Sequence, residues 1–195
     1  MKSIRLLLVE DDPFWQKRLQ EDLNLEPDME VVKVAASREQ ANQAAKTVQF
    51  DVVLLDINLS GNNLDGLDVA RDFLKNKEVQ SKVIMLTSLT DREVIIKSFQ
   101  NGAVNFINKA SYGDIVRTVR DVYHGIISIH PDASLELIKE VQLSILTPVE
   151  REVYHLKQKG YTREQIANKL FKSINTIKTQ IRSIKHKLNG DEERE

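Results

Sequence analysis

The strongest constraint on the fold of this chain is an alternation that fills its first 125 residues. Short runs rich in leucine and β-branched residues alternate with longer segments that carry an apolar residue at about every third or fourth position. Runs such as 52–55 are apolar without alternation, which is typical of strands covered on both faces. Five strand–helix repeats of this kind predict an α/β fold with a five-stranded parallel, doubly wound (flavodoxin-like) sheet. The predicted strands lie at 4–9, 30–35, 51–56, 82–87 and 104–108.

The alternation stops after His124. Residues 126–144 are interpreted as a linker with one short helix at 131–141, and residues 145–189 contain three helical segments without strand pattern. Two of these segments begin with capping boxes, at Thr147 and Thr162, and Ser173 is placed to cap the third. We therefore expect an α/β domain over 1–125, a small all-α domain over 145–189, and a disordered acidic tail over 190–195.

The charges are divided unevenly between these parts. The whole chain has 28 basic and 29 acidic side chains, yet residues 145–189 carry ten basic and three acidic ones, an asymmetry that indicates nucleic acid. The absence of cysteine excludes disulfide scaffolds and thiolate metal sites. No apolar run approaches the roughly 18 residues of a membrane span, and the N-terminal run is too short for a signal peptide. A cytoplasmic protein with no membrane contact is expected.

Polar side chains collect where the predicted strands end. Glu10 and Asp11 follow the first strand, Asp56 the third, Thr87 the fourth and Lys109 the fifth. The carboxyl ends of adjacent parallel strands meet at one edge of a sheet, so these groups converge if strands one, three, four and five are neighbours. Several carboxylates in one place need a cation, and oxygen ligands suit Mg²⁺. The pattern predicts phosphoryl transfer to the Asp56 carboxylate, with Mg²⁺ and Lys109 neutralising the transferred group.

Residues 2–125 resemble the receiver domain of bacterial two-component response regulators. The resemblance rests on four motifs in order, LVEDDP at 8–13, LLDINL at 54–59, MLTS at 85–88 and GA followed by FINK at 102–109. It implies that Glu10 and Asp11 form the acidic pair and that Asp56 is the phosphorylated residue. It further implies metal ligation by the Asn58 backbone carbonyl, a switch pair of Thr87 and Phe106, and a Lys109 that pairs with the phosphate.

The last predicted helix has two faces. Ile177, Ile181, Ile184 and Leu188 form one apolar stripe, and residues 165–189 contain six basic side chains and no carboxylate. A helix divided in this way can rest on a small core and present a basic polar face to the major groove of DNA.

Residues 146–188 resemble the LuxR-type helix-turn-helix, and a receiver joined to it is the arrangement of NarL/FixJ response regulators. The resemblance rests on LTPVEREV at 146–153, GYT at 160–162, and the apolar and polar positions up to TIKT at 176–179. It implies a positioning helix at 162–171 and a recognition helix at 174–188, with Lys178, Thr179 and Arg182 expected at base edges. The residues expected at phosphates are Thr162, Arg163, Ser173, Thr176, Gln180 and Lys185.

The leading interpretation is a DNA-binding transcriptional response regulator that a sensor histidine kinase phosphorylates on Asp56. Phosphorylation would control dimerisation and DNA binding, and the protein would not be an enzyme beyond promoting its own phosphotransfer and dephosphorylation. Because the family's usual fourth helix does not follow residue 189, a homodimer is expected to rely on the receiver. One alternative is a phosphorylation-independent interaction module with a weakened DNA domain. A phosphohydrolase of the haloacid dehalogenase type is disfavoured, since Asn58 stands where that chemistry needs a second acid.

Overall fold

The structure is a computed structural model, and it describes all residues except 1–2, 62–63, 77–78, 90, 127 and 190–195. Its contacts divide the chain into two compact units, Met1–Leu137 and Ile138–Glu195. The predicted acidic tail at 190–195 lies outside the described residues. Within the described part of the chain, no helix is long and apolar enough to cross a membrane.

The first unit is a parallel sheet with helices on both faces. Its strands have the order β2-β1-β3-β4-β5, so β1, β3, β4 and β5 are neighbours as the convergence of the polar groups requires. The predicted α/β class and five-stranded parallel sheet are confirmed. The strands are β1 (Ile4–Val9), β2 (Met29–Ala35), β3 (Val52–Leu55), β4 (Lys82–Thr87) and β5 (Ala103–Asn108).

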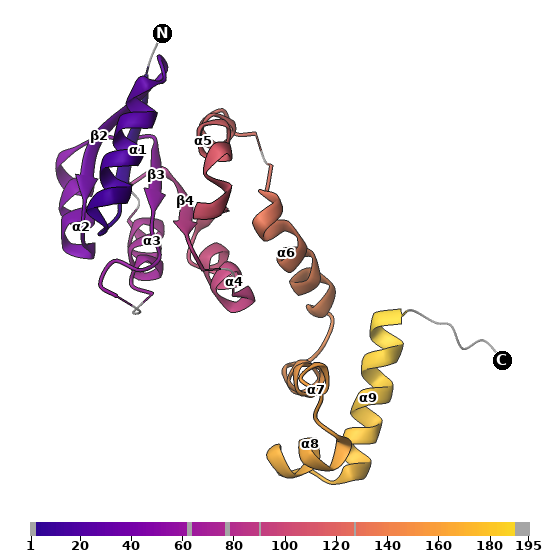
Figure 1. Ribbon diagram of the computed structural model, residues 1–195. Helices are drawn as coiled ribbons and strands as arrows, with labels where there is room; N and C mark the ends of the chain where they lie inside the picture. Colours follow the sequence, from indigo (N-terminus) through magenta and orange to yellow (C-terminus); the bar gives the residue numbers. More distant parts are fainter. Residues whose placement is uncertain (1–2, 62–63, 77–78, 90, 127, 190–195) are drawn as a thin grey trace. The chain divides into compact units, whose positions relative to one another are not determined.

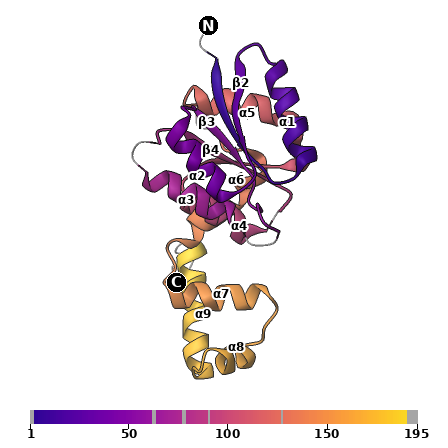
Figure 2. The same ribbon diagram turned by 90° about the vertical axis from the view of Figure 1, so that its left-hand side faces the viewer.

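Two apolar layers enclose the sheet. Helices α1 and α5 cover one face, where Leu19, Leu23 and Val119 pack against β1, β3 and β4. Helices α2, α3 and α4 cover the other face (Figure 1, Figure 2). The connections are α1 (Pro13–Leu25), α2 (Arg38–Thr47), α3 (Gly66–Lys75), α4 (Arg92–Gln100), a 3-10 helix η1 (Lys109–Asp114) and α5 (Ile115–Tyr123). Because both faces of the sheet are covered, the central strand β3 is wholly apolar and buried, as the unbroken run at 52–55 indicated.

A further helix, α6 (Pro131–Leu143), follows α5 and corresponds to the helix expected at 131–141. Its first turns belong to the first unit, since Ala133 is fully buried and Leu137 packs against the core that lines α2, α3 and α4.

The second unit is entirely helical over its described residues. It contains α7 (Pro148–Gln158), α8 (Arg163–Lys169) and α9 (Ile174–Asn189) around a core that includes Val153, Ile166 and Ile177. Both predicted capping boxes are present, at Thr147 with Glu150 and at Thr162 with Gln165. The Oγ of Ser173 accepts a hydrogen bond from the Thr176 amide at 3.0 Å, so the third predicted cap is also confirmed. The predicted caps therefore mark the starts of the three helices in the small all-α domain.

Candidate functional site

A buried lysine joins two strand ends at the carboxyl edge of the sheet. Lys109 directly follows β5, and its Nζ lies 2.6 Å from Glu10 Oε2 and 2.9 Å from Asp56 Oδ2. Glu10 and Asp56 follow β1 and β3, and all three residues are buried. These contacts place the predicted lysine, acid and acceptor in one cluster.

Asp56 is held by the turn that follows β3. Its Oδ1 accepts a hydrogen bond from the Ile57 amide at 2.6 Å, while Oδ2 accepts one from Lys109. The chain returns to this turn at Gly66, where a Cβ would lie only 2.0 Å from the Asp56 carbonyl oxygen. Glycine is therefore required at the start of α3 for the helix to approach the end of β3 so closely.

The acidic cluster fits a divalent cation. Glu10, Asp11 and Asp56 each offer a carboxylate oxygen, and these oxygens lie within 4.8 Å of one another. Glu10 Oε2 is buried and contacts the Lys109 ammonium, which also contacts Asp56. A hard cation such as Mg²⁺ prefers oxygen ligands of this kind. The donor set therefore suits the metal that the sequence predicts.

Burial and ion pairing shift the pKa values of Glu10 and Lys109 in the cluster. Burial, together with the nearby Asp56 carboxylate, raises the pKa of Glu10 to about 7 even though Lys109 opposes the shift. Burial lowers the pKa of the Lys109 ammonium, but its contacts with Glu10 and Asp56 outweigh this and raise it overall. Lys109 thus pairs with two buried carboxylates at once, and a cation bound at this place would be stabilised.

The other predicted receiver residues lie close by in the fold. Thr87 ends β4 as a buried residue whose Oγ1 accepts a hydrogen bond from the Leu89 amide at 3.2 Å. Phe106 lies in β5 opposite Met85 and is fully buried. Asn58 follows the Asp56 turn, and its side-chain oxygen accepts a hydrogen bond from the Leu64 amide.

Sequence reasoning missed Trp15, the only tryptophan of the chain. Lys109 Nζ lies 5.1 Å from the centre of the Trp15 ring, a cation–π contact made from the first turn of α1. No local pattern in the sequence marks this contact, since it joins the start of α1 to a residue far along the chain. Trp15 consequently offers a natural fluorescence probe of the cluster.

A different arrangement of charge stabilises the helical unit. Glu150 is buried, and its carboxylate accepts hydrogen bonds from Ser183 Oγ and Lys187 Nζ, both at 2.6 Å, and from the Thr147 amide at 2.8 Å. These donors, Lys187 first, lower the pKa of Glu150 to about 2. Glu150 therefore fastens the start of α7 to the C-terminal half of α9.

Most of the side chains predicted to contact DNA lie in α9, and Thr162, Arg163 and Ser173 lie at the start of α8 or just before α9. Ile177, Ile181 and Ile184 are buried in the core as the predicted stripe requires. Gln180 is half-buried with its Oε1 lacking a partner among the described residues, and the hydroxyls of Thr162 and Ser173 act as helix caps. The other predicted residues are exposed, namely Arg163, Thr176, Lys178, Thr179, Arg182 and Lys185.

The turn between α8 and α9 contains an unusual residue. Phe171 is 97% exposed and has a φ of 53°, a left-handed conformation that glycine normally adopts. Its amide donates to the Asn168 carbonyl and the Lys172 amide donates to the Ala167 carbonyl, which is the Schellman ending of a helix. The tight turn is thus made in spite of the residue type at its strained position.

Comparison with known proteins agrees with both units. Residues 6–120 match the family described as Response regulator receiver domain, and residues 144–195 match the one described as Bacterial regulatory proteins, luxR family. The chain belongs to the two-component response regulators that combine a receiver domain with a LuxR-type DNA-binding domain.

The relatives define the type within this class. The Oxygen regulatory protein NreC of Staphylococcus carnosus is 32% identical over 181 residues, covering 86% of this chain and 82% of the relative. The Response regulator protein VraR of Staphylococcus epidermidis is 28% identical over 192 residues, covering 95% and 90%. The protein is a response regulator of the NarL/FixJ type.

Solved structures support the same fold. A two-component response regulator RcsB–DNA complex matches with a TM-score of 0.70 at 20% identity, covering 98% of this chain and 95% of that one. RcsB from Salmonella enterica serovar Typhimurium, bound to a promoter in the presence of a phosphomimetic, matches with a TM-score of 0.67 at 20% identity, covering 96% and 92%.

Proposed function

We propose that this response regulator is phosphorylated on Asp56 by a sensor histidine kinase and that phosphorylation controls its dimerisation and its binding to double-stranded DNA. The observation that carries the proposal is the buried Lys109, which bridges Glu10 and Asp56 at the carboxyl edge of the sheet. An ammonium held 2.9 Å from the acceptor carboxylate is placed to pair with an anionic group attached there.

In the proposed transfer, an Asp56 carboxylate oxygen forms a bond to phosphorus while the bond from phosphorus to the histidine nitrogen of the kinase breaks. The electron pair of that bond stays with the imidazole, which takes up a proton. Glu10, Asp11, Asp56 and the Asn58 carbonyl would hold Mg²⁺, which supplies positive charge to the phosphoryl oxygens when bound. The chain itself promotes this transfer and the later hydrolysis, and it has no other enzymatic role in the proposal.

Thr87 and Phe106 would move in response to the phosphoryl group, and their movement would change the surface of the receiver. The Thr87 hydroxyl would turn from the Leu89 amide to a phosphoryl oxygen, and Phe106, which pairs with Met85 two residues before Thr87, would repack. Because Phe106 is fully buried and has no hydroxyl, its part of the switch must operate by packing.

The DNA-binding role is assigned to the exposed face of α9. Lys178, Thr179 and Arg182 would read base edges in the major groove, as their exposed position near the start of the helix allows. The RcsB structures, one of which holds dimers on DNA, support a homodimeric mode of binding. The residues assigned to the phosphate backbone are Thr162, Arg163, Ser173, Thr176, Gln180 and Lys185.

In this proposal the cytoplasmic chain is organised as a receiver over 1–125, a linker over 126–144 and a DNA-binding domain over 145–189. The family match of residues 6–120 and 144–195 supports this division.

Phosphorylation is tested with Asp56→Asn and the matched control Asp51→Asn, which alters the aspartate at the opposite end of β3. Both proteins are incubated with phosphoramidate and Mg²⁺, and the intact mass is measured. We expect the phosphoryl mass on the control but not on Asp56→Asn. Undiminished phosphorylation of Asp56→Asn would refute the assignment.

DNA recognition is tested by selecting duplexes from a random pool with and without the phosphodonor. Arg182→Ala should relax the selected sequence, whereas Lys185→Ala should weaken binding to all sequences and lower its salt dependence. Unchanged binding by both variants would count against the assigned face. Selection that ignores the phosphodonor would instead favour a phosphorylation-independent regulator.

A further inference from the structure

The segment that leads into α6 is fastened to β5 by a buried asparagine. Asn105 Nδ2 donates to the Ser128 carbonyl at 2.8 Å, and its Oδ1 accepts hydrogen bonds from the His130 amide at 3.0 Å and the Phe106 amide at 2.9 Å. Asn105 is itself almost fully buried. A buried amide whose groups are satisfied by another segment's backbone fixes that segment, because its release would leave polar groups unpaired.

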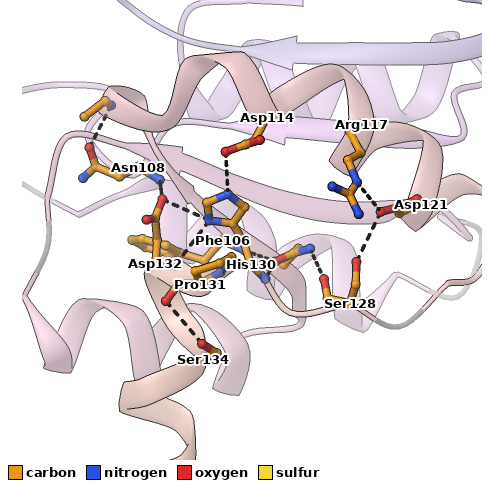
Figure 3. Close-up of polar contacts among 12 residues, drawn as sticks. Phe106, Asn108, Asp114, Arg117, Asp121, Ser128, His130, Pro131, Asp132 and Ser134 are labelled. Carbon is orange, nitrogen blue, oxygen red and sulfur yellow. Dashed lines mark hydrogen bonds and ion pairs between the residues drawn. The ribbon is translucent and has the colours of Figure 1, made fainter.

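His130 continues this attachment with two carboxylates. Figure 3 shows its ring between Asp114 and Asp132, with Nε2 3.2 Å from Asp114 Oδ2 and Nδ1 3.1 Å from Asp132 Oδ2. Nδ1 also lies 3.3 Å from the Asp132 amide nitrogen. Asp114 belongs to the end of η1 and Asp132 to the first turn of α6, so the ring links the two elements.

Asp132 makes a contact directly beside the lysine of the phosphorylation cluster. Its Oδ2 accepts a hydrogen bond from the backbone amide of Asn108 at 2.8 Å, and Asn108 is the last residue of β5 (Figure 3). The next residue is Lys109, whose ammonium contacts Glu10 and Asp56. One peptide unit therefore separates the α6 attachment from the lysine of the cluster.

The same turn of α6 also touches the switch side of the core. Ala133 is fully buried in the apolar cluster that contains Phe106, and Leu137 packs against that cluster one turn later. The end of β5 is thus connected to α6 in two ways, through the carboxylate of Asp132 and through the packing of Ala133 and Leu137.

We propose that Asp132 is a positioning residue that couples the phosphorylation cluster to α6 through the Asn108 amide. The inference rests on the proposed phosphorylation of Asp56. When Lys109 turns from Glu10 toward a phosphoryl group, the Lys109 backbone and the adjoining Asn108 amide shift, and the hydrogen bond to Asp132 is weakened or reoriented. The contact between the start of α6 and β5 then changes, and this change is transmitted along the helix toward residue 143.

The coupling is reciprocal by thermodynamic necessity. If phosphorylation alters the attachment of α6, then loss of that attachment alters the free energy of the phosphorylated state relative to the unphosphorylated one by the same coupling free energy. Asp132 would thus act on Lys109 without touching the phosphoryl group itself.

The test uses the full chain with three substitutions. Asp132→Ala removes the acceptor of the Asn108 amide, whereas Asp132→Asn keeps an acceptor oxygen and removes only the charge. Asp114→Ala is the matched control, because it removes the other carboxylate beside His130 and leaves the Asn108 contact in place.

Each protein is treated with phosphoramidate and Mg²⁺, and phosphoprotein is counted by intact mass. Hydrogen exchange of the 128–137 amides is then compared before and after treatment, and DNA affinity is measured on a duplex selected with the wild-type protein. We expect phosphorylation to change the wild-type exchange rates at least threefold. In Asp132→Ala this response should vanish and the phosphorylation-dependent gain in DNA affinity should fall at least fivefold, whereas Asp132→Asn and Asp114→Ala should stay within twofold of wild type.

The outcomes separate the two hypotheses. Absence of phosphoprotein in the wild-type chain would overturn the phosphorylation of Asp56 and the coupling with it. Normal phosphorylation with no change of exchange in the wild-type 128–137 segment would overturn the coupling alone, and this result needs no variant. A fully phosphorylated Asp132→Ala with the wild-type response would do the same.

Discussion

The two units each bury a glutamate beside a lysine, with opposite electrostatic results. Glu10 in the receiver and Glu150 in the helical unit both lie 2.6 Å from a lysine ammonium. The pKa of Glu10 is raised to about 7, mainly by burial, whereas that of Glu150 is lowered to about 2, mainly by Lys187. The cause is the deeper burial of Glu10 in the first case and the hydrogen-bond donors around Glu150 in the second.

Glu150 has its lysine to itself and accepts further hydrogen bonds from Ser183 and from the Thr147 amide. Glu10 shares Lys109 with Asp56, and its other oxygen accepts a longer hydrogen bond, 3.3 Å, from the Asp12 amide. A carboxylate with a lysine and further donors of its own can stabilise a fold, and two carboxylates that share one lysine create a site that gains from binding a cation. The comparison distinguishes a structural charge from a functional one.

The largest expected effect tests the structural carboxylate. Glu150→Gln places an amide NH₂ among donors that need an acceptor, so the free energy of unfolding of the helical unit should fall by about 2 kcal/mol. Hydrogen exchange of the α7 and α9 amides in the full chain measures this loss. Glu152→Gln, an exposed change in the same helix, is the control and should stay within about 0.5 kcal/mol. Equal behaviour of the two variants would show that Glu150 has no special role.

The next effect concerns the functional cluster. Asp11→Asn removes one negative charge from the proposed Mg²⁺ ligands, and the affinity for Mg²⁺ should fall at least about tenfold, or about 1.4 kcal/mol. Titration of the full chain with MgCl₂, followed by Trp15 fluorescence, gives the dissociation constant. Asp12→Asn is the control, since the Asp12 side chain caps α1 through the Phe14 amide. A wild-type affinity in Asp11→Asn would remove this residue from the ligand set.

The pH dependence should have opposite signs in the two units. Glu10 has a folded pKa of about 7 against an ordinary 4.5, so without metal the receiver should gain stability, on the order of 1 kcal/mol, as pH falls from 8 to 5. The folded pKa of Glu150 is about 2, so its contribution is complete above pH 4.5 and is lost as pH falls toward 2.

Urea unfolding in EDTA separates these contributions, because Trp15 fluorescence reports the receiver and hydrogen exchange reports α7 and α9. The gain between pH 8 and pH 5 should disappear in Glu10→Gln. A receiver whose stability is unchanged over this range in the wild-type chain would contradict the raised pKa of Glu10.

The smallest effect tests strain in the helical unit. Phe171→Gly should stabilise the end of α8 by about 0.5–1 kcal/mol, because glycine adopts a φ of 53° without steric cost. Protection of the α8 amides from hydrogen exchange measures the change. Phe171→Ala removes the ring but keeps the Cβ, and it should give no gain. A matching gain in both variants would assign the effect to the exposed ring and not to the backbone.

Much of the fold was predictable because its signals are local. Unbroken apolar runs, the capping residues Thr147 and Thr162, and the stripe that includes Ile177 each depend on residues within one element. The order of polar groups at strand ends likewise predicted the cluster of Glu10, Asp56 and Lys109, since parallel strands bring their carboxyl ends to one edge.

The contacts that sequence reasoning missed join elements far apart in the chain. Trp15 lies over Lys109, and Asp132 accepts a hydrogen bond from the Asn108 amide. Neither pair has a fixed spacing or periodicity, because the contacts depend on how α1 and α6 are placed against β5. A surface residue in a helix gives no local sign of the strand it meets.

The sequence by itself determined the elements, their caps and the chemistry available at the edge of the sheet. Only the tertiary structure decided which glutamate has a raised pKa and which has a lowered one. The reason is that the energy of a buried charge depends on how deeply it lies and on the donors around it, and other elements of the fold determine both. Glu10 and Glu150 are residues of the same type, and their pKa values differ because the fold places them in different surroundings.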